Sequence, residues 1–396
     1  MTPSVPESDS PRRRPSPRLK PTSVHRFVDD LFGDTIHARQ VDSLADGVSG
    51  VLHAASLAIH AIGRGLAAAK GVQAKHATKQ LDRLLSNTGI PLGRLFELWV
   101  QFVVGVRKEI VVALDWTEFD RDQQATICLY LVSSHGRATP LIWKSVEKAT
   151  LEGRRNAYED EVIERLSTAL PEDVRLTLLA DRGFGDQKRY THLRLLGWDY
   201  VIRFRDCILV TDSTGTTSPA SEWLNKTGRA RMLKAARVTD DKTEVPAVVL
   251  VHDKRMKDAW CLATSRSDLT AAEVAKLYGR RFTIEETFRD TKDVHFGMGL
   301  SATHIRSADR RDRLLFLGAI AHALLTLLGA AGERCGLDRT LKVNTVKRRT
   351  LSLYKQGCFW YDAIPAMPDQ RLIPLMTAYD ECVREQALLR EIFGLL

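Results

Sequence analysis

Residues 109–115, EIVVALD, form a short apolar run that ends in an acid, and residues 175–181, RLTLLAD, repeat that pattern. Apolar runs of this length are typical of strands buried in the centre of a sheet. A carboxylate at the end of a buried strand is costly unless another group compensates its charge, and a divalent cation is a common compensator. The two runs therefore predict core strands that end in Asp115 and Asp181.

The stretches around these runs predict an α/β protein. Two further strands are expected at 125–132 and 138–143, joined by a turn at 133–137, and a helix is expected at 159–170. The resulting order is three strands, a helix and a fourth strand. A helix at 186–196 and a strand at 200–205 follow, and β character dominates from there to residue 264.

Helices are predicted on both sides of this region. The helical region before it covers residues 23–108. In this region the leucines of QLDRLL at 80–85 share one helix face, whereas Lys79 and Arg83 lie on the other. A basic face of this kind is either simply solvated or contacts DNA. The uncharged stretch 314–332 is barely long enough to cross a bilayer, and its histidine and glycines favour a helix buried in the core.

The composition is that of a globular protein with a basic balance. The 396 residues include 58 Lys and Arg against 49 Asp and Glu, which gives a net charge of +9. A positive field attracts nucleic acid or anionic lipid, but the charge alone does not choose between them. The six cysteines form no CxxC pair, which argues against a zinc ribbon or a thioredoxin-like site.

A third acid, Glu285, lies on a helix that we expect to run from Ser267 past Lys292. Tyr278, Arg281, Glu285 and Lys292 would share an arc of roughly 60° at about 100° per residue, and Arg289 extends this stripe. Such a row is either a set of surface ion pairs or a phosphate grip beside a metal-binding carboxylate. Three converging carboxylates would suit Mg²⁺, which prefers oxygen ligands.

These residues carry a family resemblance. The pattern Y-x2-R-x3-E-x6-K over residues 278–292 resembles the YREK signature of bacterial insertion-sequence transposases, a branch of the DDE transposases. Four further segments resemble motifs of that family: LDWTE at 114–118, ADRGFGD at 180–186, HGRATPLIW at 135–143 and KQLDRLLSN at 79–87.

The resemblance implies an RNase H-like mixed sheet with an all-β insertion domain, a helical N-terminal domain and a helical C-terminal region. The expected divisions are a disordered basic tail (1–22), a helical DNA-binding domain (23–108), the two parts of the catalytic domain (109–205 and 265–335), the β-rich insertion (206–264) and the C-terminal helical region (336–396).

The resemblance also implies a cut-and-paste mechanism in the bacterial cytoplasm. Asp115, Asp181 and Glu285 would hold two Mg²⁺ ions, for which Mn²⁺ can substitute, and Tyr278, Arg281 and Lys292 would grip DNA phosphates. The reaction would proceed by nicking, hairpin formation, hairpin opening and strand transfer into target DNA. The family assembles as a homodimer that bridges the two terminal inverted repeats, with no membrane involved.

Relatives stack a flipped base on a tryptophan in the strand before the signature helix. Trp260 is the candidate here, with packing in the core as its alternative role. Two other functions remain open: an RNase H-like nuclease that does not join strands, and a catalytically silent DNA-binding derivative. No P-loop, HExxH or GxSxG motif supports another chemistry.

Overall fold

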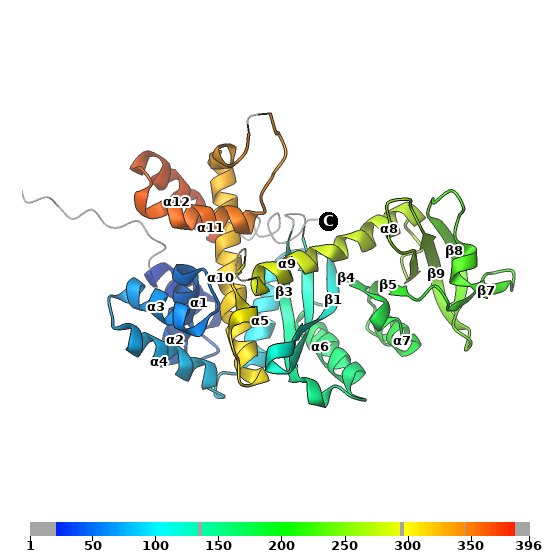
Figure 1. The fold of residues 1–396 in the computed structure, drawn as a ribbon, viewed down its shortest axis with the longest axis horizontal. Helices are drawn as coiled ribbons and strands as arrows, with labels where there is room; N and C mark the ends of the chain where they lie inside the picture. Colours follow the sequence, from blue (N-terminus) through cyan, green and yellow to red (C-terminus); the bar gives the residue numbers. More distant parts are fainter. Residues whose placement is uncertain (1–20, 134–136, 294–296, 344, 385–396) are drawn as a thin grey trace, which may run out of the picture.

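The computed structural model describes residues 21–133, 137–293, 297–343 and 345–384 (Figure 1). Most of the predicted basic tail, residues 1–20, lies outside them, as do residues 134–136 of the predicted turn. The first helix begins at Pro21, two residues before the predicted helical region.

Ten strands form a single mixed sheet within the described residues, in the order β3-β2-β1-β4-β5-β10-β9-β8-β6-β7. Strands β1, β4 and β5 are parallel neighbours, and the remaining pairs are antiparallel. The strands are β1 (Glu109–Phe119), β2 (Gln124–Val132), β3 (Ala138–Glu147), β4 (Arg175–Ala180), β5 (Asp199–Phe204), β6 (Leu209–Thr211), β7 (Thr217–Pro219), β8 (Arg231–Val238), β9 (Thr243–Val251) and β10 (Trp260–Thr264).

The helices precede, cover and follow this sheet. They are α1 (Pro21–Phe32), α2 (Ala38–Ala54), α3 (Ile59–Lys70), α4 (Ala74–Ser86), α5 (Leu92–Val104), α6 (Arg155–Ala169), α7 (Gln187–Leu195), α8 (Ala271–Gly279), α9 (Thr283–Lys292), α10 (Ala308–Arg334), α11 (Leu353–Ala363) and α12 (Asp369–Arg384). This mixed α/β architecture with helical ends confirms the predicted fold class, and β1-β2-β3-α6-β4 is the predicted order.

The strands of the predicted insertion, residues 206–264, continue the central sheet edge to edge. Its last strand, β10, pairs antiparallel with β5, with Cys261 opposite Phe204 and Thr264 opposite Val201. Strands β9, β8, β6 and β7 then follow outward, so the sheet extends across Figure 1 from β3 to β7. Strand β7 is an addition to the predicted elements. At three residues, it is too short to show an alternating pattern.

Side chains of β1 alternate between two helical layers. Asp115 accepts a hydrogen bond from Arg281, which lies just before α9. Its neighbour Trp116 points to the other face, where its indole N–H donates to Glu159 of α6 at 2.8 Å. Because successive side chains of a strand point to opposite faces, α9 and α6 cover opposite faces of the sheet.

Helix α10 is the central helix of the core. It contacts α2, α4, α11, α12 and β3. Of the described helices, it alone is long and apolar enough to cross a bilayer unbroken, and 94% of its most apolar window is buried inside the protein. The prediction of a buried core helix at 314–332 is therefore confirmed.

The backbones of α10 and α11 approach each other so closely that only glycine fits at two positions of their crossing. A Cβ added to Gly329 would lie 1.9 Å from the Leu353 carbonyl oxygen, and one on Gly357 would lie 1.8 Å from that of Leu325. No side chain tolerates such contacts, so both positions require glycine for α11 to lie against α10.

The same crossing buries His322, which makes stability depend on pH. Its ring stacks on Tyr354 at 4.3 Å, and neither ring nitrogen has a hydrogen-bond partner within the described part of the chain. Burial lowers the pKa of His322 from 6.5 to about 4. The unfolded chain therefore binds the proton first, and stability is lost as the pH falls from 6.5 to 4.

We expect His322→Phe to remove this acid sensitivity while keeping the stacked ring. When the pH falls from 6.5 to 4, the free energy of unfolding of the native chain should decrease by roughly 3 kcal/mol more than that of the variant. Urea unfolding at pH 7 and pH 4.5 measures the difference. An equal loss of stability in both proteins would show that His322 does not carry it.

Candidate active site

The first two acids lie side by side because of the register of the parallel strands. Leu114 of β1 is opposite Ala180 of β4, so the residues that follow them, Asp115 and Asp181, are neighbours. Asp181 caps the short 3-10 helix after β4 by accepting a hydrogen bond from the Gly183 N–H at 2.8 Å. Asp181 directly follows β4, as predicted, but the predicted end of the first strand at Asp115 is wrong, because β1 continues to Phe119 through its pairing with β2.

The expected uninterrupted helix from Ser267 past Lys292 is wrong. Helix α8 begins after Thr270, whose hydroxyl accepts from the Glu273 N–H in a capping box. A 3-10 turn at Arg280–Phe282 then separates α8 from α9. Because a 3-10 turn advances by about 120° per residue instead of 100°, the predicted stripe is not one straight row.

Arg281 connects the first acid to the third. One terminal guanidinium nitrogen donates to the Asp115 carboxylate at 2.8 Å, and the other donates to Glu285 at 3.3 Å. The Arg281 side chain is 8% exposed, whereas that of Glu285 is 54% exposed. The 3-10 turn places the arginine inside the site and leaves Glu285 at its open side.

The electrostatics of Asp115 reflect a crowded site. Its pKa is raised from 3.8 to about 6, chiefly because burial disfavours the charged form; the nearby Asp181 raises it further, while Arg281 opposes the change. Any additional positive charge beside Asp115 would stabilise its ionised form. The Arg281 guanidinium supplies part of that charge.

The three acids suit a hard divalent cation in their chemistry. Among the described residues, however, no three His, Cys, Asp or Glu side chains are arranged closely enough to form a metal centre. Arg281 stands between Asp115 and Glu285 and occupies the space between their carboxylates. Carboxylate oxygens are nevertheless the ligands that Mg²⁺ and Mn²⁺ accept, so the donor set fits.

The signature tyrosine belongs to an aromatic cluster beside this arginine. Tyr278 is buried and meets the Trp260 ring edge-on at 5.0 Å. Phe282 stacks on Trp260 at 5.9 Å and 28°, yet keeps 41% of its surface exposed. Phe282 was not among the predicted site residues, although its place directly after Arg281 was a usable signal. Trp260, partly buried, thus lies between a core ring and an exposed ring.

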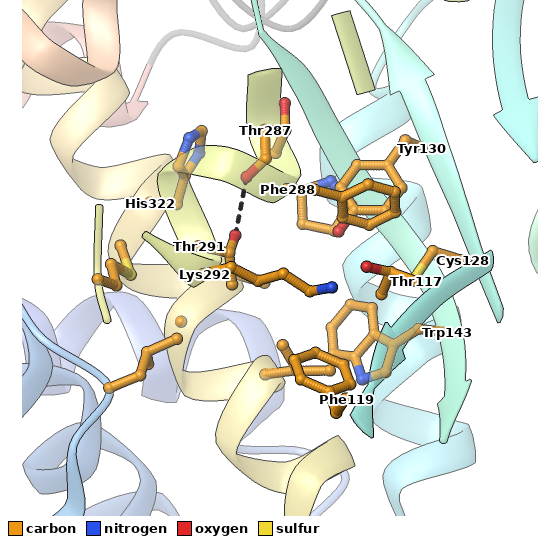
Figure 2. Close-up of a pocket in the computed structure, with 16 residues that line it drawn as sticks. Thr117, Phe119, Cys128, Tyr130, Trp143, Thr287, Phe288, Thr291, Lys292 and His322 are labelled. Carbon is orange, nitrogen blue, oxygen red and sulfur yellow. Dashed lines mark hydrogen bonds between the residues drawn. The ribbon is translucent and has the colours of Figure 1, made fainter. Parts of the chain in front are cut away.

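Lys292 takes part in the packing of α9 on the sheet. Its ammonium donates to the Glu118 carbonyl oxygen at 2.7 Å and lies 4.6 Å from the Phe119 ring centroid. Burial lowers the pKa of Lys292. Figure 2 shows the ammonium pointing toward Thr117 and Cys128 inside a pocket of about 30 Å³, space for about one or two waters.

Helix α9 is docked at the start of β3 by further polar contacts. The Ala138 N–H donates to the Thr287 hydroxyl at 2.8 Å, and the same hydroxyl donates to the Ala138 carbonyl oxygen at 3.1 Å. Arg137 pairs with the buried Asp290. These contacts fix α9, and with it Glu285, against the sheet.

The remaining predicted DNA-contacting residues are exposed. Arg289 pairs with Glu286 on the surface of α9. Lys79 and Arg83 are exposed on α4, whereas the leucines on the opposite face of that helix are buried. The amphipathic pattern predicted for α4 is therefore present.

Comparison with known proteins supports a transposase. Residues 144–324 match the profile of the family described as "Transposase DDE domain". The matched range contains Asp181 and Glu285 and begins after Asp115. A search of curated proteins finds no match. The profile match, together with the fold, supports placing this chain in a DDE transposase family.

Proposed function

We propose that this protein is a cut-and-paste DNA transposase of the YREK type that acts through Asp115, Asp181 and Glu285. The main support is that Asp115 on β1 lies beside Asp181, which directly follows the parallel strand β4, while Arg281 joins Asp115 to Glu285. Asp115 and Glu285 are 170 residues apart in sequence, yet both accept hydrogen bonds from the same guanidinium, and residues 144–324 match the transposase profile.

The chain's own residues would hold and orient the DNA. Asp115, Asp181 and Glu285 would bind Mg²⁺, which supplies stabilisation of the attacking and leaving oxygens when bound. Arg281 presents donors that can turn from the carboxylates to a phosphate, since a guanidinium matches the geometry of both. Lys292 already holds the end of β1 through the Glu118 carbonyl and would position α9 beside the cut.

The same site would serve each step of the reaction. Nicking by water, attack of the 3′-hydroxyl on the opposite strand, hairpin opening and strand transfer are all in-line phosphoryl transfers. All require stabilisation of the same developing charge, so one fixed constellation suffices. Two copies of the chain would bridge the two inverted repeats, as the family resemblance implies, and the protein would act on DNA in the bacterial cytoplasm.

Strand transfer distinguishes this function from a nuclease without joining activity. A pre-cleaved DNA end taken from the sequence flanking the gene, a supercoiled target plasmid and Mg²⁺ should yield covalently joined product. Hydrolysis of the end with no joining would assign the nuclease function instead. Binding without either reaction would assign the silent derivative.

The aromatic cluster supports a role in hairpin formation. The exposed Phe282 ring and the partly exposed Trp260 ring form a stack that an unpaired base can join. Base–aromatic stacking contributes about 1–3 kcal/mol per base, which offsets the cost of unstacking the DNA end.

We expect Trp260→Ala to slow hairpin formation by roughly tenfold to a hundredfold while changing the first nick by much less. Single-turnover assays that follow both products on denaturing gels measure the two steps. Phe282→Leu is the matched variant, because it keeps an apolar side chain and removes only the exposed ring. Equal loss of nicking and hairpin formation in Trp260→Ala would return that residue to a purely structural role.

A further inference from the structure

The connection between α10 and α11 carries a group of exposed cations. We name residues 345–350, TVKRRT, the basic arm. It contains no helix or strand and leads into α11, and Figure 1 shows the connection reaching away from the helices that it joins. Lys347 and Arg348 of the arm are exposed, as is Arg339 in the turn that precedes it.

Both ends of this connection are anchored by ion pairs. Arg349 forms two hydrogen bonds of 2.6 Å with the Glu333 carboxylate of α10. Lys342 donates to Asp338 at 2.7 Å. The two acids therefore neutralise two of the cations, and Glu333 ties the far end of the connection to the end of α10, whereas the Asp338 pair lies within the connection.

The remaining cations are held outward without such pairing. Within the described residues, Arg339, Lys347 and Arg348 make no ion pair with a carboxylate. Arg339 and Lys347 border a hollow of about 440 Å³ between the connection and the end of α10, together with Lys342 and the paired acids Glu333 and Asp338. A fixed hollow rimmed by cations attracts a polyanion more strongly than a flat surface does.

The helix after the arm reaches the catalytic layer. The Lys355 ammonium, two residues into α11, lies 3.9 Å from the buried Asp290 carboxylate of α9. The arm itself begins beyond Arg334, which is roughly 20 Å along α10 from Ala319 in the pocket under α9. A duplex lying along this part of α10 would cover the same length in roughly six base pairs.

We propose that Arg339, Lys347 and Arg348 form a second contact for duplex DNA, which binds backbone phosphates away from the cleavage site. This inference rests on the proposed function, because it assigns to the arm a part of the same DNA substrate. The contact is to phosphates and carries no sequence preference of its own. This contact affects the affinity for DNA and the register of binding, whereas the chemical step depends on Asp115, Asp181 and Glu285.

The test is the salt dependence of binding to a labelled duplex of about 30 base pairs. Each lost phosphate contact lowers the slope of log K against log salt by about 0.9, so Lys347→Ala/Arg348→Ala should lower it by about 2. The control Lys188→Ala/Arg194→Ala removes the same charge from exposed positions on α7. Its slope should stay close to that of the native chain.

Cleavage at saturating protein should be unchanged in the arm variant, and charge reversal by Lys347→Glu/Arg348→Glu should weaken binding further. Equal slopes for the arm variant and the control would overturn the inference, as would retention of native affinity by the reversed variant. Binding of anionic vesicles in preference to duplex DNA would overturn it as well. Failure of the native chain to bind any duplex would instead refute the proposed transposase function.

Discussion

Asp115→Asn is expected to abolish Mg²⁺-dependent nicking, with a loss of at least about a thousandfold in the single-turnover rate. The change removes a negative charge from the carboxylate set, and the stabilisation of transition-state charge that depends on it contributes several kcal/mol. The amide oxygen of asparagine can still accept the hydrogen bond that Arg281 donates to Asp115. The fold and the binding of transposon ends should therefore be retained.

The control for this experiment is Asp120→Asn. Asp120 follows β1, is exposed and pairs with Lys148, away from Arg281. We expect its nicking rate to stay within about twofold of the native rate, because exposed ion pairs contribute little. Nicking by Asp115→Asn at the control's rate would remove Asp115 from the catalytic set.

Arg311→Met is expected to destabilise the fold by about 3–5 kcal/mol. Arg311 is completely buried at the start of α10 and donates to the buried Asp122 carboxylate at 2.5 Å and to Gln124 at 2.7 Å. Its guanidinium also lies 3.8 Å from the Phe119 ring centroid. Methionine fills much of the volume but removes the buried cation beside Asp122, whose other partners are the Ile305 N–H and the exposed His304 ring.

Urea unfolding measures the loss, with Arg306→Met as the control, since Arg306 is exposed and should cost less than about 0.5 kcal/mol. The double variant Arg311→Met/Asp122→Leu should recover part of the stability by removing the stranded carboxylate. A single variant as stable as the control would mean that water or a rearranged side chain compensates Asp122.

The strands of the sheet were predictable because their signals are local. Apolar runs of five to eight residues bounded by turn residues predict β1, β2, β4 and β9 with errors of a few residues at their ends. Asp115 and Asp181, which end the apolar runs of β1 and β4, could be selected for the same reason, although β1 itself continues to Phe119. The pairing of β10 with β5 was not predictable, since it joins residues about 60 positions apart and depends on tertiary packing.

The geometry of the candidate site was predictable only in part. The break at Arg280–Phe282 is not marked by proline, and the alternation of charges across it fits an uninterrupted helix equally well. That break orients Arg281 toward Asp115 and exposes Phe282. The burial of Arg311 was not predictable for a different reason. A basic residue before an apolar run is typical of a solvated helix start, and only the structure shows that Arg311 pairs with the Asp122 carboxylate.

The edge-to-edge continuation of the sheet from β5 into β10 has a consequence for how the molecule unfolds. Four backbone pairs join β5 and β10, so β10 and the strands beyond it cannot separate without exposing the edge of β5. Strands β6–β10 and strands β1–β5 should accordingly melt as one cooperative unit, and amides of β10 should exchange with solvent as slowly as those of β4. A ladder of backbone pairs then holds the Trp260 ring at a fixed distance from Asp181. This distance does not fluctuate as it would if a flexible linker joined the two parts.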